Sequence, residues 1–171
     1  MKQSVFTIQS NERLTESVCK MVLAGDTSAI TAAGQFVNIQ LKGFFLRRPI
    51  SVCDYDENTL TILYKIVGKG TEAMSKMKAP HKLDILTGLG NGYDTSKSGD
   101  KPLLIGGGVG VPPMYRLAKN LLAEGKKPSS FSALIQRTKS SMQKNLKHWA
   151  QRCISQRQTA LSAQRASLRM W

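Results

Sequence analysis

Three short groups of residues have the types and spacing that suit phosphate-bearing ligands. The first group is Arg47-Arg48-Pro49-Ile50-Ser51. An arginine on a strand can clamp a pyrophosphate, because its planar guanidinium donates two parallel hydrogen bonds. A serine two residues beyond Pro49 can place its hydroxyl beside a ring nitrogen. Alone, the group also fits an edge strand whose arginines are solvated.

The second group is Gly68-Lys69-Gly70-Thr71, which precedes a short helix pattern over 71–77. Gly70 allows a ligand to approach the backbone closely, and Thr71 can open the helix as a cap and hydrogen-bond donor. The positive end of the helix then favours a phosphate. A plain helix N-cap without a ligand explains the same residues.

The third group consists of four glycines between a short apolar run and a helix pattern, namely Gly106, Gly107, Gly108 and Gly110. Such glycines let backbone N–H groups approach an anionic or planar ligand, and the following helix adds its positive end. Their spacing is neither the dinucleotide-binding fingerprint nor that of a P-loop. A glycine-rich strand-to-helix turn without a ligand is the alternative.

The elements that would position these groups follow two successive patterns. The first contains short segments that alternate apolar and polar residues, which predicts an antiparallel barrel or sandwich. The strand candidates are 5–10, 18–24, 36–41, 49–55, 59–67 and 83–86. A polar stretch at 94–101 is expected to be a linker. An apolar run at 102–105 then leads through the glycines into a helix at 112–124, which is the opening of a nucleotide-binding α/β domain.

In this order, the motifs resemble the ferredoxin–NADP reductase superfamily. The most similar branch is the electron-transfer subunit of NAD-dependent (class B type) dihydroorotate dehydrogenase. The resemblance covers about residues 1–127. It rests on Gly34-Gln35-Phe36-Val37, Arg48-Pro49-Ile50-Ser51-Val52-Cys53-Asp54, Leu63-Tyr64-Lys65, Gly68-Lys69-Gly70-Thr71, Leu89-Gly90-Asn91-Gly92-Tyr93 and Gly106-Gly107-Gly108-Val109-Gly110.

The resemblance implies a β barrel plus α/β architecture. An antiparallel Greek-key, FAD-binding barrel would span 1–99, and the start of an NAD-binding α/β domain, left incomplete, would span 100–127. The implied FAD-binding residues are Arg48, Pro49, Ile50, Ser51, Leu63, Tyr64, Lys65, Gly70 and Thr71. The implied NAD-facing residues are Gly106, Gly107, Gly108 and Gly110. The flavin would carry the redox chemistry, so no catalytic acid or base is expected.

The implied activity is electron transfer from an FMN-containing, dihydroorotate-oxidising subunit through FAD to NAD, in de novo pyrimidine (UMP) biosynthesis. The two kinds of subunit would form a heterotetramer. Another ferredoxin-reductase-like flavin oxidoreductase subunit is the alternative among enzymes.

Two departures from the family affect this expectation. Family members carry four closely spaced cysteines that hold a [2Fe-2S] cluster. This chain has Cys19, Cys53 and Cys153, which are far apart, so we expect neither that cluster nor another metal site, and hence a defective electron route. An incomplete α/β domain would also leave apolar sheet surface uncovered, which predicts poor solubility.

The segment 128–171 differs in composition from the rest of the chain. It holds eight basic residues and no Asp, Glu or Gly, whereas residues 1–127 carry 17 basic and 11 acidic groups. One interpretation is a basic helical tail, which would suit nucleic acid or a membrane surface. It rests on apolar residues at helical spacing, namely Met142, Leu146, Trp149, Cys153 and Ile154. This interpretation makes a basic nucleic-acid-binding module the alternative function of a different class.

The preferred interpretation of 128–171 is translation in a shifted reading frame. Asp and Glu codons begin with GA, so a frame moved forward by one base reads them as codons for residues such as Lys, Arg and Ser. An acidic stretch thus becomes basic.

Bulk composition and the N-terminus set the expected compartment. A hydrophobic fraction of 41% is enough for a packed core. The chain contains no apolar run long enough to span a membrane. The segment Met1–Ser10 lacks the apolar stretch and cleavage site of a signal peptide. We therefore expect a cytoplasmic protein with no membrane partner.

Overall fold

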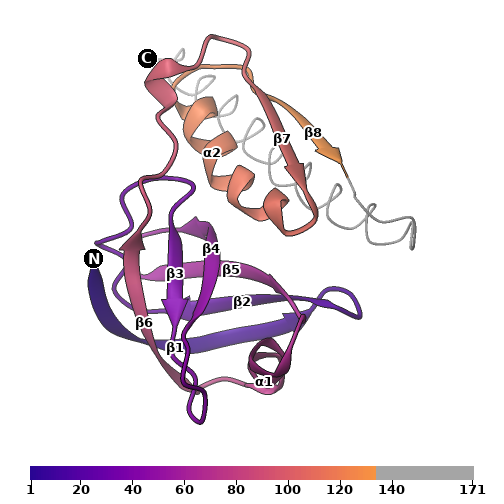
Figure 1. The fold of residues 1–171 in the computed structure, drawn as a ribbon. Helices are drawn as coiled ribbons and strands as arrows, with labels where there is room; N and C mark the ends of the chain where they lie inside the picture. Colours follow the sequence, from indigo (N-terminus) through magenta and orange to yellow (C-terminus); the bar gives the residue numbers. More distant parts are fainter. Residues whose placement is uncertain (134–171) are drawn as a thin grey trace, which may run out of the picture. The chain divides into compact units, whose positions relative to one another are not determined.

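The computed structural model describes residues 1–133, in which six antiparallel strands close into a barrel (Figure 1). The strands are β1 (Lys2–Arg13), β2 (Val18–Ala24), β3 (Phe36–Ile39), β4 (Arg48–Tyr55), β5 (Thr59–Lys65) and β6 (Lys82–Leu89). Around the barrel they follow the order β1-β2-β5-β4-β3-β6, so β2 pairs with β5 instead of β3. This order confirms the Greek-key barrel expected from the sequence.

The barrel closes around side chains that alternate along each strand. On β1, Phe6 and Ile8 are 0% and 1% exposed, whereas Val5 is 61% exposed. The same alternation on the other strands supplies the rest of the core, which includes Met21, Leu23, Val37, Ile39, Leu60, Ile62 and Ile85. Burying an aliphatic side chain of this size stabilises the fold by about 1.5–3 kcal/mol. The hydrophobic alternation therefore determines which face of each strand lies inside.

The helix α1 (Lys69–Lys76) connects β5 to β6 and begins two residues before its expected start. Its N-cap residue is Gly68. The Thr71 hydroxyl accepts hydrogen bonds from the backbone N–H groups of Val67 (3.0 Å) and Gly68 (3.3 Å). Thr71 is thus the third helical residue, and its side chain stabilises the cap from inside the helix instead of opening the helix.

The glycines after β6 pack against the loop that precedes β3. Gly34 has a φ of 91°, and a Cβ atom there would lie 2.5 Å from the Tyr93 ring. Gly92 has a φ of 75°, and a Cβ atom there would lie 2.5 Å from Ala32. Only glycine combines this backbone conformation with such a close approach. The Leu89-Gly90-Asn91-Gly92-Tyr93 string therefore has a packing role.

After the barrel, two parallel strands and one helix form an α/β element (Figure 1). The strand β7 (Leu103–Gly107) leads through the 3-10 turn η2 (Gly108–Gly110) into α2 (Val111–Ala123), and β8 (Ser129–Ala133) follows. The strand and helix expected before residue 127 are present. The strand β8 lies within the segment that we interpreted as an atypical tail, so that segment begins with a strand paired to β7.

The helix α2 covers one face of β7. Leu104 packs there against helix residues Leu117, Ala118 and Leu121. On the opposite face, Leu103 and Ile105 are 59% and 62% exposed. Exposed apolar side chains on a strand favour association between molecules. The expected poor solubility stays a prediction.

The expected linker at 94–101 is held by side chains from the end of α2. It contains a short 3-10 helix, η1 (Thr95–Lys97). The Lys126 ammonium donates hydrogen bonds to the Thr95 carbonyl (2.6 Å) and to the Ser98 hydroxyl (2.9 Å). The Thr95 hydroxyl donates to the Glu124 carboxylate (2.6 Å). The segment therefore has a defined path between the barrel and β7.

The expectations for the C-terminal segment and for membrane-spanning helices have different outcomes. The residues on which the tail helix rests, including Cys153, lie within 134–171, outside the described residues. The shifted-frame segment, 128–171, lies largely outside them as well, and its interpretation stays a prediction. Within residues 1–133, no helix has the length and apolar character needed to cross a membrane.

Candidate functional site

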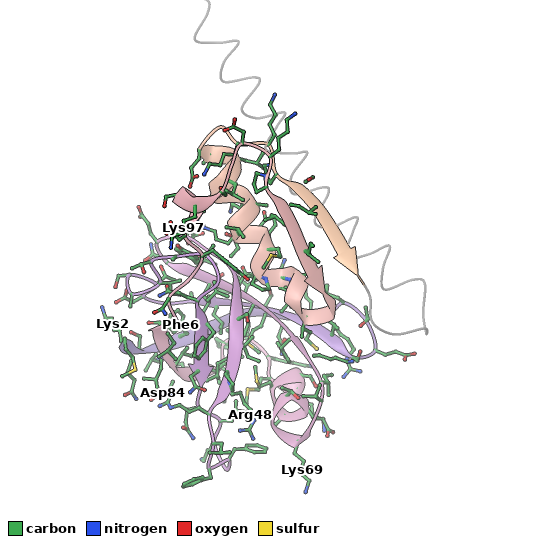
Figure 2. All side chains as sticks on the ribbon, turned by 45° about the horizontal axis from the view of Figure 1, so that its top comes forward. Lys2, Phe6, Arg48, Lys69, Asp84 and Lys97 are labelled. Atoms are coloured by element: carbon green, nitrogen blue, oxygen red, sulfur yellow. The ribbon has the colours of Figure 1, made fainter. Side chains whose placement is uncertain are left out.

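Arg48 lies at the start of β4 and folds onto the first turn of α1. Its guanidinium is 5.1 Å from the centroid of the Phe44 ring, and its Nη1 atom donates to the Leu46 carbonyl (2.5 Å). A Cβ atom on Gly70 would overlap Arg48 Nε and Cζ. The guanidinium therefore rests directly on the Gly70 backbone, and Figure 2 shows Arg48 beside the helix that begins at Lys69.

The first turn of α1 adds backbone donors to this guanidinium. The N–H groups of the first residues of a helix have no acceptor within the helix. In α1 these residues are Lys69, Gly70 and Thr71. The Thr71 hydroxyl is used within the cap, where it also donates to the Gly68 carbonyl (3.1 Å). The backbone N–H groups, the helix dipole and the guanidinium converge, which is a suitable arrangement for a phosphate group.

The other expected FAD residues on β4 and β5 lie on neighbouring strands, but they do not all face the same way. Ser51 pairs with Phe36 across β4 and β3, and it is partly exposed. On β5, Leu63 and Tyr64 are 3% and 1% exposed, and Tyr64 belongs to the barrel core. Lys65 is partly exposed, so its side chain is the reachable one of the three.

Tyr64 is directed into the barrel, away from the turn at Arg48. Its hydroxyl donates a hydrogen bond to Asn11 Oδ1 on β1 (3.0 Å). Burial, together with the neighbouring Cys19 thiol, raises the pKa of Tyr64 well above its usual range, so the phenol is neutral at physiological pH. The side chain of Tyr64 therefore belongs to the barrel core.

Arg47 points to a different part of the barrel from Arg48. Its Nη2 atom lies 2.7 Å from Asp84 Oδ1, and its Nη1 atom donates to the Asn38 carbonyl (3.2 Å). Burial alone would raise the pKa of Asp84, but hydrogen bonds from Arg47 and Gln3 outweigh it and hold that pKa below its usual value. Arg47 thus links β3 to β6, and it is neither solvated nor part of the Arg48 site.

The glycine segment between β7 and α2 lies against β5. A Cβ atom on Gly106 would lie 2.9 Å from the Gly110 carbonyl oxygen, so Gly106 is needed for the turn itself. Gly108 has a φ of 53°, and a Cβ atom on Gly110 would meet nothing within 4 Å. The open backbone at Gly110 leaves room for a ligand. Sequence reasoning treated these glycines alike, whereas the structure gives them different roles.

An ion cluster holds α2 against β4. Asp54 Oδ2 lies 2.6 Å from Lys119 Nζ, and Asp54 Oδ1 lies 3.2 Å from Arg116 Nη1. Arg116 also donates to the Tyr55 carbonyl, and its guanidinium lies 3.9 Å from the centroid of the Tyr55 ring. This cluster fixes the glycine segment relative to the strand that carries Arg48 and Ser51. Its members are far apart in the sequence, so their spacing gave no signal.

No family model matches the chain. Over 133 residues it is 39% identical to the electron transfer subunit of dihydroorotate dehydrogenase B (NAD(+)) from Bacillus pumilus, a match that covers 73% of this chain and 52% of that protein. Over 125 residues it is 43% identical to the same subunit from Streptococcus mutans, with 70% and 48% covered. The chain is a homologue of these electron-transfer subunits. It spans about half the length of the curated relatives it matches.

Solved structures agree with this relationship. The chain resembles an NADH-dependent reduced ferredoxin-NADP oxidoreductase with a TM-score of 0.65 and 29% identity, over 78% of this chain and 49% of the other. It resembles a cytochrome P450 reductase from Amycolatopsis with a TM-score of 0.70 and 19% identity, over 80% and 44%. The second likeness shows the fold alone. Together they establish the ferredoxin-reductase type of barrel for this homologue of the electron-transfer subunits.

The two cysteines in the described part of the chain are buried and separate. Cys19 is on β2, and Cys53 is on β4. Among residues 1–133, no group of three or more His, Cys, Asp or Glu side chains is placed to hold a metal ion.

Proposed function

We propose that this chain binds FAD and acts as an electron-transfer subunit. It would pass electrons from an FMN-containing, dihydroorotate-oxidising partner to NAD in de novo pyrimidine biosynthesis, in the cytoplasm. The names of the curated relatives support the reaction and the existence of a partner subunit. The described residues fit the flavin nucleotide, because an arginine and the first turn of a helix meet at one point. When bound, FAD supplies the redox chemistry.

Each side chain then has a defined task in the proposed complex. Arg48 and the N–H groups of Gly70 and Thr71 bind the pyrophosphate, where charge-assisted hydrogen bonds are strongest. Ser51, on the same strand as Arg48, places its hydroxyl beside the flavin ring. Lys65 adds a positive charge on the neighbouring strand. Pro49, Ile50, Leu63 and Tyr64 shape the site through their backbone and packing.

The glycine segment is proposed to face the nicotinamide nucleotide through Gly107, Gly108 and Gly110, while Gly106 shapes the turn. We also propose the boundary between the FAD-binding barrel and the α/β element at residues 99–100. The Asp54 cluster supports a fixed position of the α/β element on the barrel, because it links α2 directly to β4.

The observation that carries the proposal is the contact of the Arg48 guanidinium with Gly70 at the start of α1. The purified chain is incubated with FAD and desalted, and its visible absorbance spectrum is recorded. We expect retained flavin bands in the natural chain and in Arg13→Ala, which removes an exposed arginine from β1. Arg48→Ala should lose the bands. Loss in both variants, or in neither, would contradict a pyrophosphate site at Arg48.

A further inference from the structure

The C-terminal end of α1 is held by one side chain from β1. Asn11, on β1, uses its Nδ2 group to donate hydrogen bonds to the Met74 carbonyl (2.9 Å) and to the Met77 carbonyl (2.9 Å). Met74 is in the last turn of α1, and Met77 is its C-cap residue. The last carbonyls of a helix have few partners within it. The Met74 carbonyl also accepts from the Met77 N–H (3.1 Å), and the Asn11 amide adds a second bond there as well as a bond to the Met77 carbonyl.

The third hydrogen bond of Asn11 fixes its orientation. Asn11 Oδ1 accepts from the Tyr64 hydroxyl (3.0 Å), and Tyr64 is only 1% exposed. An amide turned the other way would bring its oxygen against two carbonyl oxygens, so only one orientation is compatible with these three partners. Tyr64 therefore holds Asn11, and Asn11 holds the end of α1.

The short length of α1 makes this attachment important for its other end. An isolated helix of eight residues is not stable in water, so its position depends on contacts with the barrel. At a rise of 1.5 Å per residue, its length is about 12 Å. A tilt of about 10° at the C-terminal end would move the first turn by about 2 Å. Hydrogen bonds tolerate only a few tenths of an ångström, from about 2.7 to 3.2 Å.

We propose that Asn11 and Tyr64 are positioning residues for the phosphate-binding turn. They act through α1 and hold the N–H groups of Gly70 and Thr71 where the Arg48 guanidinium can share one phosphate with them. This inference rests on the proposed FAD function and deepens it. It gives Tyr64, which the resemblance implied to be a ligand contact, a role inside the barrel.

The first test measures FAD affinity by titration in the full chain. Asn11→Asp keeps the size of the side chain but removes both donors, and Tyr64→Phe removes the hydroxyl that holds it. We expect each variant to weaken FAD binding about tenfold, a change of about 1.4 kcal/mol. Asn58→Ala, in the exposed β4–β5 turn, is the control and should bind FAD like the natural chain.

A spectroscopic readout separates positioning from general damage. At saturating FAD, the visible spectrum of both variants should equal that of the natural chain, because the flavin ring lies along β4 in the proposed complex, away from α1. A changed spectrum, or unchanged affinity, would overturn the positioning role. In addition, Asn11→Asp and the double variant with Tyr64→Phe should bind FAD equally weakly, since both changes act on one attachment.

The second test does not depend on FAD. Hydrogen exchange of the α1 amides is measured in the flavin-free chain. Asn11→Asp should accelerate exchange at Glu72–Lys76 and leave β2 and β5 unchanged, because only the end of the helix is released. Equal exchange rates of the α1 amides in the natural chain and in Asn11→Asp would refute the attachment. If the natural chain retains no FAD while Asn11→Asp still accelerates exchange in α1, the proposed function is contradicted and the attachment is supported.

Discussion

The ion cluster at Asp54 predicts a specific loss of stability. Asp54→Asn keeps the shape of the side chain and removes its charge, which leaves two cations, Arg116 and Lys119, without their shared carboxylate. The three side chains are only 23%, 22% and 19% exposed, so solvent replaces the carboxylate poorly. Breaking a buried pair costs about 3–5 kcal/mol, whereas exposed pairs contribute about 0.2–1 kcal/mol.

The value for Asp54→Asn should lie between these limits. Arg116 keeps its bond to the Tyr55 carbonyl and its contact with the Tyr55 ring, which reduces the loss. We therefore expect about 2 kcal/mol. For a chain of this size, that value corresponds to a fall in melting temperature of about 4–8 °C. Hydrogen exchange in α2 should accelerate as well, since the cluster attaches that helix to β4.

Thermal unfolding followed by circular dichroism measures this change. The matched control is Asp94→Asn, because Asp94 also pairs with a lysine (3.4 Å to Lys97) but the two side chains are 53% and 83% exposed. The control should shift the melting temperature by less than about 2 °C. Equal shifts for the two variants would show that burial does not strengthen the Asp54 cluster, and the reasoning would be refuted.

Three further predictions concern the cofactor turn, a backbone contact and acid stability. Gly70→Ala puts a methyl group where the Arg48 guanidinium lies, so the FAD affinity measured by titration should fall at least about tenfold, with little change in melting temperature. The control is Gly68→Ala, whose methyl group meets open space and which should bind FAD like the natural chain. Gly34→Ala adds a steric overlap to a positive φ, and Gly43→Ala adds only the φ strain, so urea unfolding should show a larger loss for the first by about 1–3 kcal/mol. The pKa of Asp84 is lowered in the folded chain, so the ionised carboxylate stabilises the fold fully above the ordinary pKa of 3.8, and this stabilisation is lost as the pH falls through the lower folded pKa. Asp84→Asn should therefore flatten the pH dependence of the urea midpoint below pH 3.8. An unchanged slope would contradict this.

The barrel was predictable because its signals are local. Alternating apolar residues on β1 and β2 indicate which face of each strand is buried, and the turn at 56–58 places β4 next to β5. The order of Arg48 and Gly70 along the chain also predicted a phosphate-binding turn, which stays a prediction. Their direct contact required the closed barrel, which brings β4 beside the chain that follows β5.

The directions of the site residues on β5, and the role of Asn11, depend on the closed fold. Leu63, Tyr64 and Lys65 are consecutive on a strand, so their side chains cannot all face one ligand. Leu60, Ile62 and Tyr64 are two residues apart on β5, so the alternation in the sequence already indicated that Tyr64 points inward. Asn11 gave no such signal, because its partners are more than fifty residues away in the sequence.

The first turns of α1 and α2 are chemically different, and in the proposed complex this difference suits them to different parts of the ligands. The first turn of α1 has three consecutive N–H groups and an arginine resting on it. The first turn of α2 contains Pro112 and Pro113, which are buried and have no N–H groups to donate. In the proposed complex, a pyrophosphate would therefore find more donors at α1, while the open backbone at Gly110 before α2 would suit the flat face of a ring. An exchange of roles would require donors at α2 that its prolines exclude.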